Sequence, residues 1–241
     1  MSAGQLIGVG VGPGDPELIT VKGVRALKEA DAVFVPVSDE GEPGRAESVV
    51  AAHVDPESIT RLRFSLSFDE KARERDWDEA GRRVSAVVAD GGTAAFATIG
   101  DPNVYSTFTY LAATVTNAVP GTVVTTVPGI TAMQDLASRV GTPLVEGTER
   151  LALVPFTAGD EQLELALASF DTVVAYKGGR HLDRVLDVID KAGRLEQAVF
   201  GARLGLDGER VGEAKDQSGE PAPYLSTVIV TATRDGRGSK L

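Results

Sequence analysis

The sequence predicts an α/β protein with two domains. Through the first half of the chain, apolar runs of strand length alternate with segments of helical periodicity, as in a parallel sheet covered by helices. In the second half the last strands follow one another without an intervening helix, which favours antiparallel pairing and hence a mixed sheet. The chain has 241 residues, of which 42% are hydrophobic, so it can bury a substantial core.

The first half contains four predicted strands, residues 6–11, 32–37, 93–99 and 123–127. The predicted helices are residues 15–30, a segment ending near 89, residues 105–116 and a segment from 129 to about 140. Asp15 and Pro16 provide the cap and first position of the first helix. Ser67 and Glu70 form a capping box before the second.

The second half contains predicted strands at 151–156, 172–176, 198–202 and 227–232, and helices at 161–168 and 182–191. The turn at Pro120-Gly121 is taken as the boundary between the domains. The organisation expected is therefore an N-terminal domain over residues 1–119, a C-terminal domain over 120–234 and a flexible polar tail over 235–241.

Composition excludes several classes of protein. The net charge of −11 argues against nucleic-acid binding and requires a locally basic pocket for any polyanionic substrate. The chain has no cysteine and two separated histidines, so we expect no protein-bound metal. No apolar run reaches the ~18 residues of a membrane span, and no secretory signal is visible, so a cytoplasmic location is expected.

The stretch Gly8-Val9-Gly10-Val11-Gly12-Pro13-Gly14-Asp15-Pro16 is glycine-rich but unsuited to phosphate. Its two prolines remove backbone N–H donors, and Asp15 adds a negative charge where a phosphate would lie. The spacing of a dinucleotide-binding loop and the ending of a P-loop are both absent. We expect a ligand without phosphate at this turn.

Three loops that end predicted strands share glycine, proline and a small polar residue: 12–15, 100–102 and 128–131. Ligands of open α/β sheets bind beyond the carboxyl ends of strands, so these loops predict a ligand site. Taken singly, Asp15, Asp101 and Thr131 are more simply explained as caps of the following helices, but capping alone does not explain three similar loops.

The three loops together resemble the signature motifs of the tetrapyrrole methylases. Residues 10–20 resemble the opening motif, Gly100-Asp101-Pro102-Asn103-Val104-Tyr105 the second, and Val127-Pro128-Gly129-Ile130-Thr131-Ala132 the third. The resemblance extends over about residues 5–233. Within the family, residues 101–108 with Tyr176-Lys177 are most similar to the precorrin-2 and cobalt-factor II C-20 methyltransferases.

The resemblance implies S-adenosylmethionine as methyl donor, a tetrapyrrole substrate, a homodimer, and two α/β domains with the ligand cleft between them. It also implies methyl transfer to C-20 in cobalamin biosynthesis. By motif position, the donor-binding residues are Pro13, Ile99, Gly100, Asp101, Val104, Thr131, Ala132, Lys177 and Leu204. Lys177 stands where relatives often have methionine, so it is also a candidate for a substrate carboxylate.

Side-chain roles follow as hypotheses. Asp101 and Tyr105 are the candidates for positioning the reactants, and Arg139, Lys177 and Arg180 for binding substrate carboxylates. Two alternatives stay open: a methylase of the same family that acts on another corrinoid carbon or on a non-tetrapyrrole acceptor, and a non-enzymatic corrinoid or nucleoside carrier.

Overall fold

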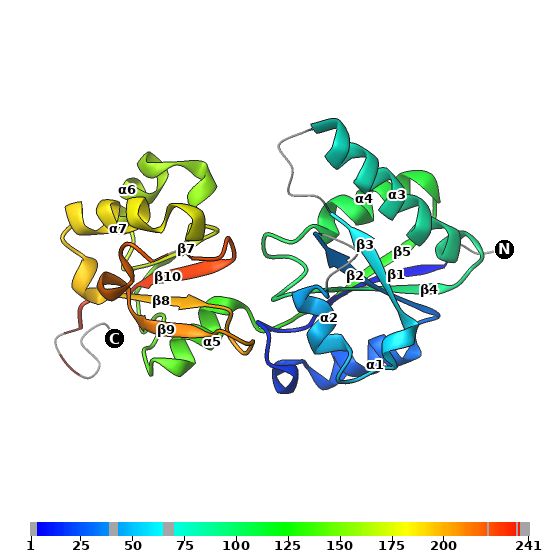
Figure 1. Ribbon diagram of the computed structural model, residues 1–241, viewed down its shortest axis with the longest axis horizontal. Helices are drawn as coiled ribbons and strands as arrows, with labels where there is room; N and C mark the ends of the chain where they lie inside the picture. Colours follow the sequence, from blue (N-terminus) through cyan, green and yellow to red (C-terminus); the bar gives the residue numbers. More distant parts are fainter. Residues whose placement is uncertain (1–3, 39–42, 65–69, 221, 235, 237–241) are drawn as a thin grey trace. The chain divides into compact units, whose positions relative to one another are not determined.

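The computed structural model describes residues 4–38, 43–64, 70–220, 222–234 and 236, in two compact units that divide between Thr131 and Ala132. Each unit contains one five-stranded sheet with helices on both faces (Figure 1). No helix in these ranges is long and apolar enough to span a bilayer. The tail predicted over residues 235–241 lies outside the described residues except for Gly236.

The sheet of the first unit is entirely parallel, with the order β3-β2-β4-β1-β5. Its strands are β1 (Gln5–Gly10), β2 (Ala32–Val37), β3 (Ile59–Arg63), β4 (Thr93–Thr98) and β5 (Val123–Val127). Helices α1 (Val21–Glu29) and α2 (Arg45–Val50) cover one face, and α3 (Glu70–Ala89) and α4 (Phe108–Ala118) cover the other (Figure 1). Each face has its own apolar core, which explains why β1, β2 and β4 are buried on both sides.

The predicted domain boundary at residue 120 is too early. Strand β5 pairs in parallel with β1 and so completes the first sheet, which moves the division to Thr131. A turn at Pro120-Gly121 marks the end of α4, and a turn of this kind is equally compatible with a loop inside a domain.

Two predicted helices begin later than expected. In place of one helix from Asp15, a 3-10 turn (Pro16–Leu18) precedes α1, and the hydroxyl of Thr20 caps α1 by accepting from Gly23 N–H at 3.0 Å. Helix α4 begins at Phe108 because Tyr105 has a left-handed backbone with φ 50°. The structure also adds α2 and β3, which the sequence did not predict, while the Ser67 half of the predicted capping box lies outside the described residues.

The second unit contains a mixed sheet with the order β6-β7-β10-β8-β9. Its strands are β6 (Leu151–Pro155), β7 (Thr172–Tyr176), β8 (Ala198–Ala202), β9 (Arg210–Glu213) and β10 (Ser226–Val230), of which β9 was not predicted. Helices α6 (Asp160–Ser169) and α7 (Leu182–Lys191) cover one face and α5 (Ala132–Arg139) the other (Figure 1). Strand β10 is antiparallel to both of its neighbours, β7 and β8, as the sequence indicated for the last strands.

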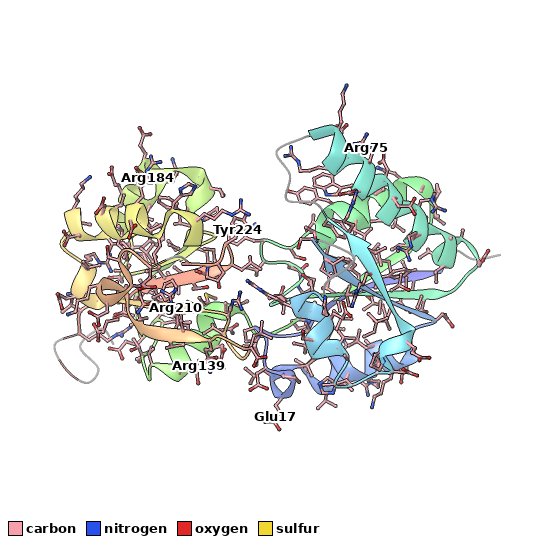
Figure 2. All side chains as sticks on the ribbon, in the orientation of Figure 1. Glu17, Arg75, Arg139, Arg184, Arg210 and Tyr224 are labelled. Atoms are coloured by element: carbon pink, nitrogen blue, oxygen red, sulfur yellow. The ribbon has the colours of Figure 1, made fainter. Side chains whose placement is uncertain are left out.

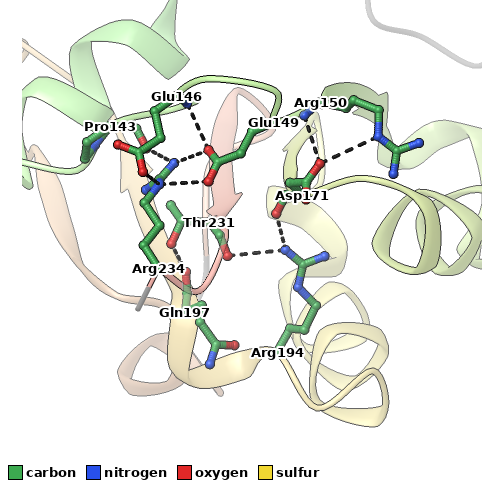
Figure 3. A network of polar contacts seen from close by, with 9 residues as sticks. All are labelled: Pro143, Glu146, Glu149, Arg150, Asp171, Arg194, Gln197, Thr231 and Arg234. Carbon is green, nitrogen blue, oxygen red and sulfur yellow. Dashed lines mark hydrogen bonds and ion pairs between the residues drawn. The ribbon is translucent and has the colours of Figure 1, made fainter. Parts of the chain in front are cut away.

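Two arginines fasten the end of the second unit (Figure 3). Arg234 donates to both carboxylate oxygens of Glu149, at 3.0 and 2.6 Å, and the Glu149 side chain is 0% exposed. Arg194 donates to the backbone carbonyls of Asp171 and Thr231, among others, and so joins the turn before β7 to the residue after β10. The guanidinium of Arg234 lowers the pKa of Glu149 by hydrogen bonding to its charged form.

Candidate functional site

The three glycine-rich loops meet at the carboxyl edge of the first sheet. They follow β1, β4 and β5, which are adjacent in the sheet. Gly100 N–H donates to the carbonyl of Gly12 at 2.7 Å, and the two residues form an isolated antiparallel bridge. We call residues 12–15, 100–105 and 128–131 the loop cluster. It lies where β1 and β4 send their chains to helices on opposite faces, the position at which open α/β sheets bind ligands.

Backbone packing holds the loops together so closely that no side chain fits between them. A Cβ atom on Gly129 would lie 2.1 Å from the carbonyl oxygen of Gly100 and 2.8 Å from Gly10. A Cβ atom on Gly10 would lie 2.6 Å from the same Gly100 oxygen. These glycines therefore serve close approach of three backbone segments.

Asp101 connects two of the loops through its carboxylate. Oδ1 accepts from Asn103 N–H at 2.7 Å, and Oδ2 accepts from Gly129 N–H at 3.0 Å. The first bond closes a local turn, and the second ties the loop after β4 to the loop after β5. Asp101 is thus a loop tie and not a cap of α4, whereas Asp15 does cap the 3-10 turn by accepting from Glu17 N–H at 2.8 Å.

The loop after β4 continues into a strained segment. Ser106 Oγ lies 3.0 Å from Thr98 Oγ1 and accepts from Phe108 N–H at 3.1 Å, which fixes the start of α4. Between these anchors and Asp101, Tyr105 has a left-handed backbone and is 43% exposed. Partial burial raises the pKa of its phenol, so Tyr105 stays neutral at physiological pH.

The remaining predicted residues of the first unit surround these contacts. Pro13 and Gly100 are buried, Ile99 and Val104 are partly buried, and Thr131 is 7% exposed. Val104 N–H donates to the carbonyl of Asp101 at 3.2 Å, so it belongs to the same turn. The structure therefore brings all six predicted donor-binding residues of this unit, together with Tyr105, to one edge of the sheet.

In the second unit, Ala132 and Lys177 lie near one another through Tyr176. Ala132 is the first residue of α5, and the Tyr176 hydroxyl accepts from Met133 N–H at 3.1 Å, a donor that the helix itself leaves unpaired. Lys177 follows Tyr176 at the end of β7 with a left-handed backbone, φ 61°. Burial lowers the pKa of its ammonium group.

The other three predicted residues of this unit lie in different environments. Leu204 is 4% exposed, in the core between α5 and the sheet. Arg139 is engaged by Asp135 at 2.9 Å and Glu209 at 2.8 Å. Arg180 lies over the ring of Tyr224, 5.4 Å from its centroid. Figure 2 shows Tyr224 and Arg139 on opposite sides of the second sheet.

The chemistry of the loop cluster fits an uncharged or cationic ligand better than a phosphate. Pro13 offers no N–H, Gly100 N–H and Gly129 N–H are already used inside the cluster, and Asp101 contributes negative charge. Within the described ranges, no three His, Asp or Glu side chains are grouped so as to hold a metal ion.

A parallel sheet that ends in such a loop cluster, followed by a mixed-sheet unit, defines a class of two-unit α/β proteins whose strand-end loops are better suited to a ligand without phosphate. Residues 5–217 match the family of Tetrapyrrole (Corrin/Porphyrin) Methylases. The chain belongs to this family.

Two relatives and one solved structure show which members of the family are similar to this chain over nearly its whole length. The chain is 33% identical to the precorrin-2 C(20)-methyltransferase of Sinorhizobium sp., over 98% of each chain. It is 30% identical to the cobalt-precorrin-2 C(20)-methyltransferase of Salmonella typhimurium, over 94% of this chain and 96% of that one. The fold matches that of the uroporphyrin-III C-methyltransferase of Thermus thermophilus complexed with S-adenyl homocysteine, with a TM-score of 0.65 and 24% identity over 94% and 97% of the chains.

Sequence reasoning missed Arg203 and Tyr224. Arg203 directly follows β8 with φ 53°, and Tyr224 precedes β10 by two residues. The available signal for Arg203 was a cation placed immediately after a predicted buried strand, as for Lys177.

Proposed function

We propose that this protein transfers a methyl group from S-adenosylmethionine to C-20 of precorrin-2 or of its cobalt-containing form, in cobalamin biosynthesis. The observation that carries the proposal is full-length similarity, at 30–33% identity, to two proteins named for this reaction. The loop cluster supports it, because the residues there suit a donor without phosphate. We further propose a homodimer in the cytoplasm, with no metal bound by the protein itself.

The sulfonium of the donor, when bound, supplies an electrophilic methyl group, so the protein needs no nucleophile of its own. The part left to this chain is to orient the reactants and exclude water, and good orientation can lower a barrier by about 7–11 kcal/mol. We assign donor positioning to the loop cluster, with Asp101 keeping two loops in register, and to Ala132 of the second unit. Of the two roles open to Lys177, we assign it the binding of a substrate carboxylate. Tyr105 is assigned to orienting a reactant and not to proton abstraction.

Anaerobic incubation with S-adenosylmethionine and with metal-free and cobalt-containing precorrin-2, side by side, tests the proposal. Mass spectrometry gives the number of methyl groups added, and NMR with a 13C-labelled donor gives the carbon that receives them. Methylation at C-20 is expected. A methyl group at another carbon contradicts the assignment within the family, and binding of the donor without any transfer favours a carrier.

A further inference from the structure

The carboxyl edge of the second sheet carries an unusual pair of cations. Among the described residues, three that are not glycine have a left-handed backbone: Tyr105, Lys177 and Arg203. The first belongs to the loop cluster. The other two are both cationic, and each is the first residue after its strand, β7 or β8. Left-handed backbone at such residues costs roughly 1–3 kcal/mol each and is concentrated at functional sites.

Strand register places Lys177 and Arg203 on either side of one strand. Tyr176 is level with Thr227 of β10, so Lys177 comes level with Ser226. Ala202 is level with Ser226, the first residue of β10, so Arg203 comes level with the residue just before that strand. Since β10 lies between β7 and β8, the two backbones are separated by two strand spacings, about 10 Å.

A third cation is held at the same edge by backbone packing. A Cβ atom on Gly179 would lie 1.7 Å from the carbonyl oxygen of Pro223, so only glycine allows the turn after β7 to contact the segment before β10. This contact brings Arg180 over the ring of Tyr224, at 5.4 Å. The stacked guanidinium keeps its in-plane donors available to a planar acceptor.

The contacts of Arg203 involve a backbone carbonyl and no carboxylate among the described residues. Glu209, in the loop after β8, accepts from Gly205 N–H and from Arg139. The guanidinium of Arg203 donates one long bond, 3.4 Å, to the carbonyl of Asp207, and among the described residues no ion pair is formed with it. In a chain of net charge −11, a guanidinium at a strand end without an ion pair among the described residues is suited to bind an anionic group of a ligand.

We propose that Lys177 and Arg203, supported by Arg180 and attached to backbones about 10 Å apart, form a two-point clamp for carboxylates on separate arms of the tetrapyrrole. This inference rests on the proposed function for the identity of the substrate. The left-handed backbone ends both strands at these residues, so that two cationic residues flank the start of β10 at backbone positions whose spacing the sheet sets. The clamp selects a rigid polycarboxylate over a single carboxylate, because only two arms engage both cations.

The test uses the whole chain with the substitutions Lys177→Gln and Arg203→Gln, which remove charge and keep a side chain. Lys191→Gln is the matched control: it makes the same change of charge at an exposed residue of the same unit, at the far end of α7. Two probes are used, the KM for precorrin-2 and the Kd for uroporphyrin, a non-reacting porphyrin with carboxylate arms. The Kd for S-adenosylmethionine and the melting temperature are measured alongside.

Each of the two site variants is expected to raise the KM and the uroporphyrin Kd about tenfold, as for loss of one charge-assisted bond. The melting temperature should not change, Lys191→Gln should behave as the original protein, and Arg203→Lys should recover part of the affinity. Lys177→Gly and Arg203→Gly should weaken binding equally while raising the melting temperature, because glycine relieves the left-handed strain.

Unchanged binding in Lys177→Gln and Arg203→Gln overturns the clamp, and so does an equal loss in Lys191→Gln, which would reveal a general charge effect. If the original protein fails to methylate precorrin-2 but binds uroporphyrin through both cations, the proposed function fails and the clamp stands. If it methylates precorrin-2 with a KM that neither cation affects, the clamp fails and the function stands.

Discussion

The two units prepare their sheet edges in different ways. In the first unit the edge is made of backbone: glycines at positions 10 and 129 let three backbone segments touch, and Asp101 ties two of the loops together. In the second unit the edge carries long charged side chains, and the backbone strain falls on Lys177 and Arg203. The difference indicates that the first edge depends on shape and tolerates almost no added atom, whereas the second depends on charge.

Gly129→Ala should give the largest effect, and it tests whether the first edge depends on shape. The added Cβ atom meets the Gly100 carbonyl oxygen at 2.1 Å, and backbone on both sides cannot yield as a side chain would. We expect a loss of roughly 3 kcal/mol or more in unfolding free energy and at least a tenfold weaker affinity for S-adenosylmethionine, measured by thermal unfolding and calorimetry.

Gly212→Ala in β9 is the control for that substitution, because a Cβ there makes only an ordinary contact, 3.7 Å from Gln217. Equal behaviour of the two alanine variants would show that the loops can separate without loss, contrary to the view that the first edge depends on shape.

The second expected effect concerns the charged network of the second unit. Arg234→Met leaves the buried carboxylate of Glu149 without its bidentate partner, at a cost of about 2–3 kcal/mol near neutral pH. Chemical denaturation of the variant checks this value. A loss of that size at pH 7 confirms that charge pairing holds this unit together.

The pH dependence of the unfolding free energy tests the direction of the pKa shift of Glu149. The pKa of Glu149 is lower in the folded protein than its unfolded value of about 4.3, so its contribution is complete above that pH. The contribution is lost as the pH falls below about 4.3 toward the folded pKa. Denaturation of the original protein and of Arg234→Met as a function of pH should therefore converge in acid. A constant difference down to low pH would contradict the assignment.

Asp101→Ala tests the tie within the loop cluster. Loss of the bonds to Asn103 N–H and Gly129 N–H should weaken S-adenosylmethionine binding about tenfold, while the apolar cores keep the first unit folded. Calorimetry and circular dichroism separate the two effects. If the affinity is unchanged, Asp101 has no part in holding the donor.

Tyr105→Phe should give the smallest effect. The ring, the left-handed backbone and the burial are kept, and one hydroxyl is lost, so we expect KM for one of the two substrates to rise about threefold. Steady-state kinetics with each substrate varied in turn measures it. A fall in kcat of a hundredfold or more would instead identify the phenol as an acid or base.

The sequence predicted the parallel and mixed sheets and the meeting of the three loops, because buried strands and strand-end glycines are local signals. It did not predict β3 and β9: Ile59–Arg63 has two arginines and a threonine among five residues, and Arg210–Glu213 begins and ends with a charge. It also placed the boundary too early, since pairing of Val123–Val127 with β1 is a long-range event.

The candidate site was also predictable only where its signals were local. Residues of the loop cluster were found through their motifs, but the bond from Asp101 to Gly129 joins residues far apart in sequence. Arg139 looked like a free cation in sequence, whereas α5 and the loop before β9 supply it with two carboxylates. Arg203 was missed although it directly follows a predicted strand, because the positive φ that distinguishes it has no sequence signature.

The position of β10 has a consequence for how the protein is made. All strands of the first sheet have been synthesised once the ribosome has passed Val127, so that unit can fold while translation continues. The middle of the second sheet stays vacant until Val230 has been added, so β7 lacks its β10 neighbour for the 54 residues made after Tyr176, and β8 for the 28 made after Ala202. The nascent second half is therefore the part of this protein that most needs a chaperone.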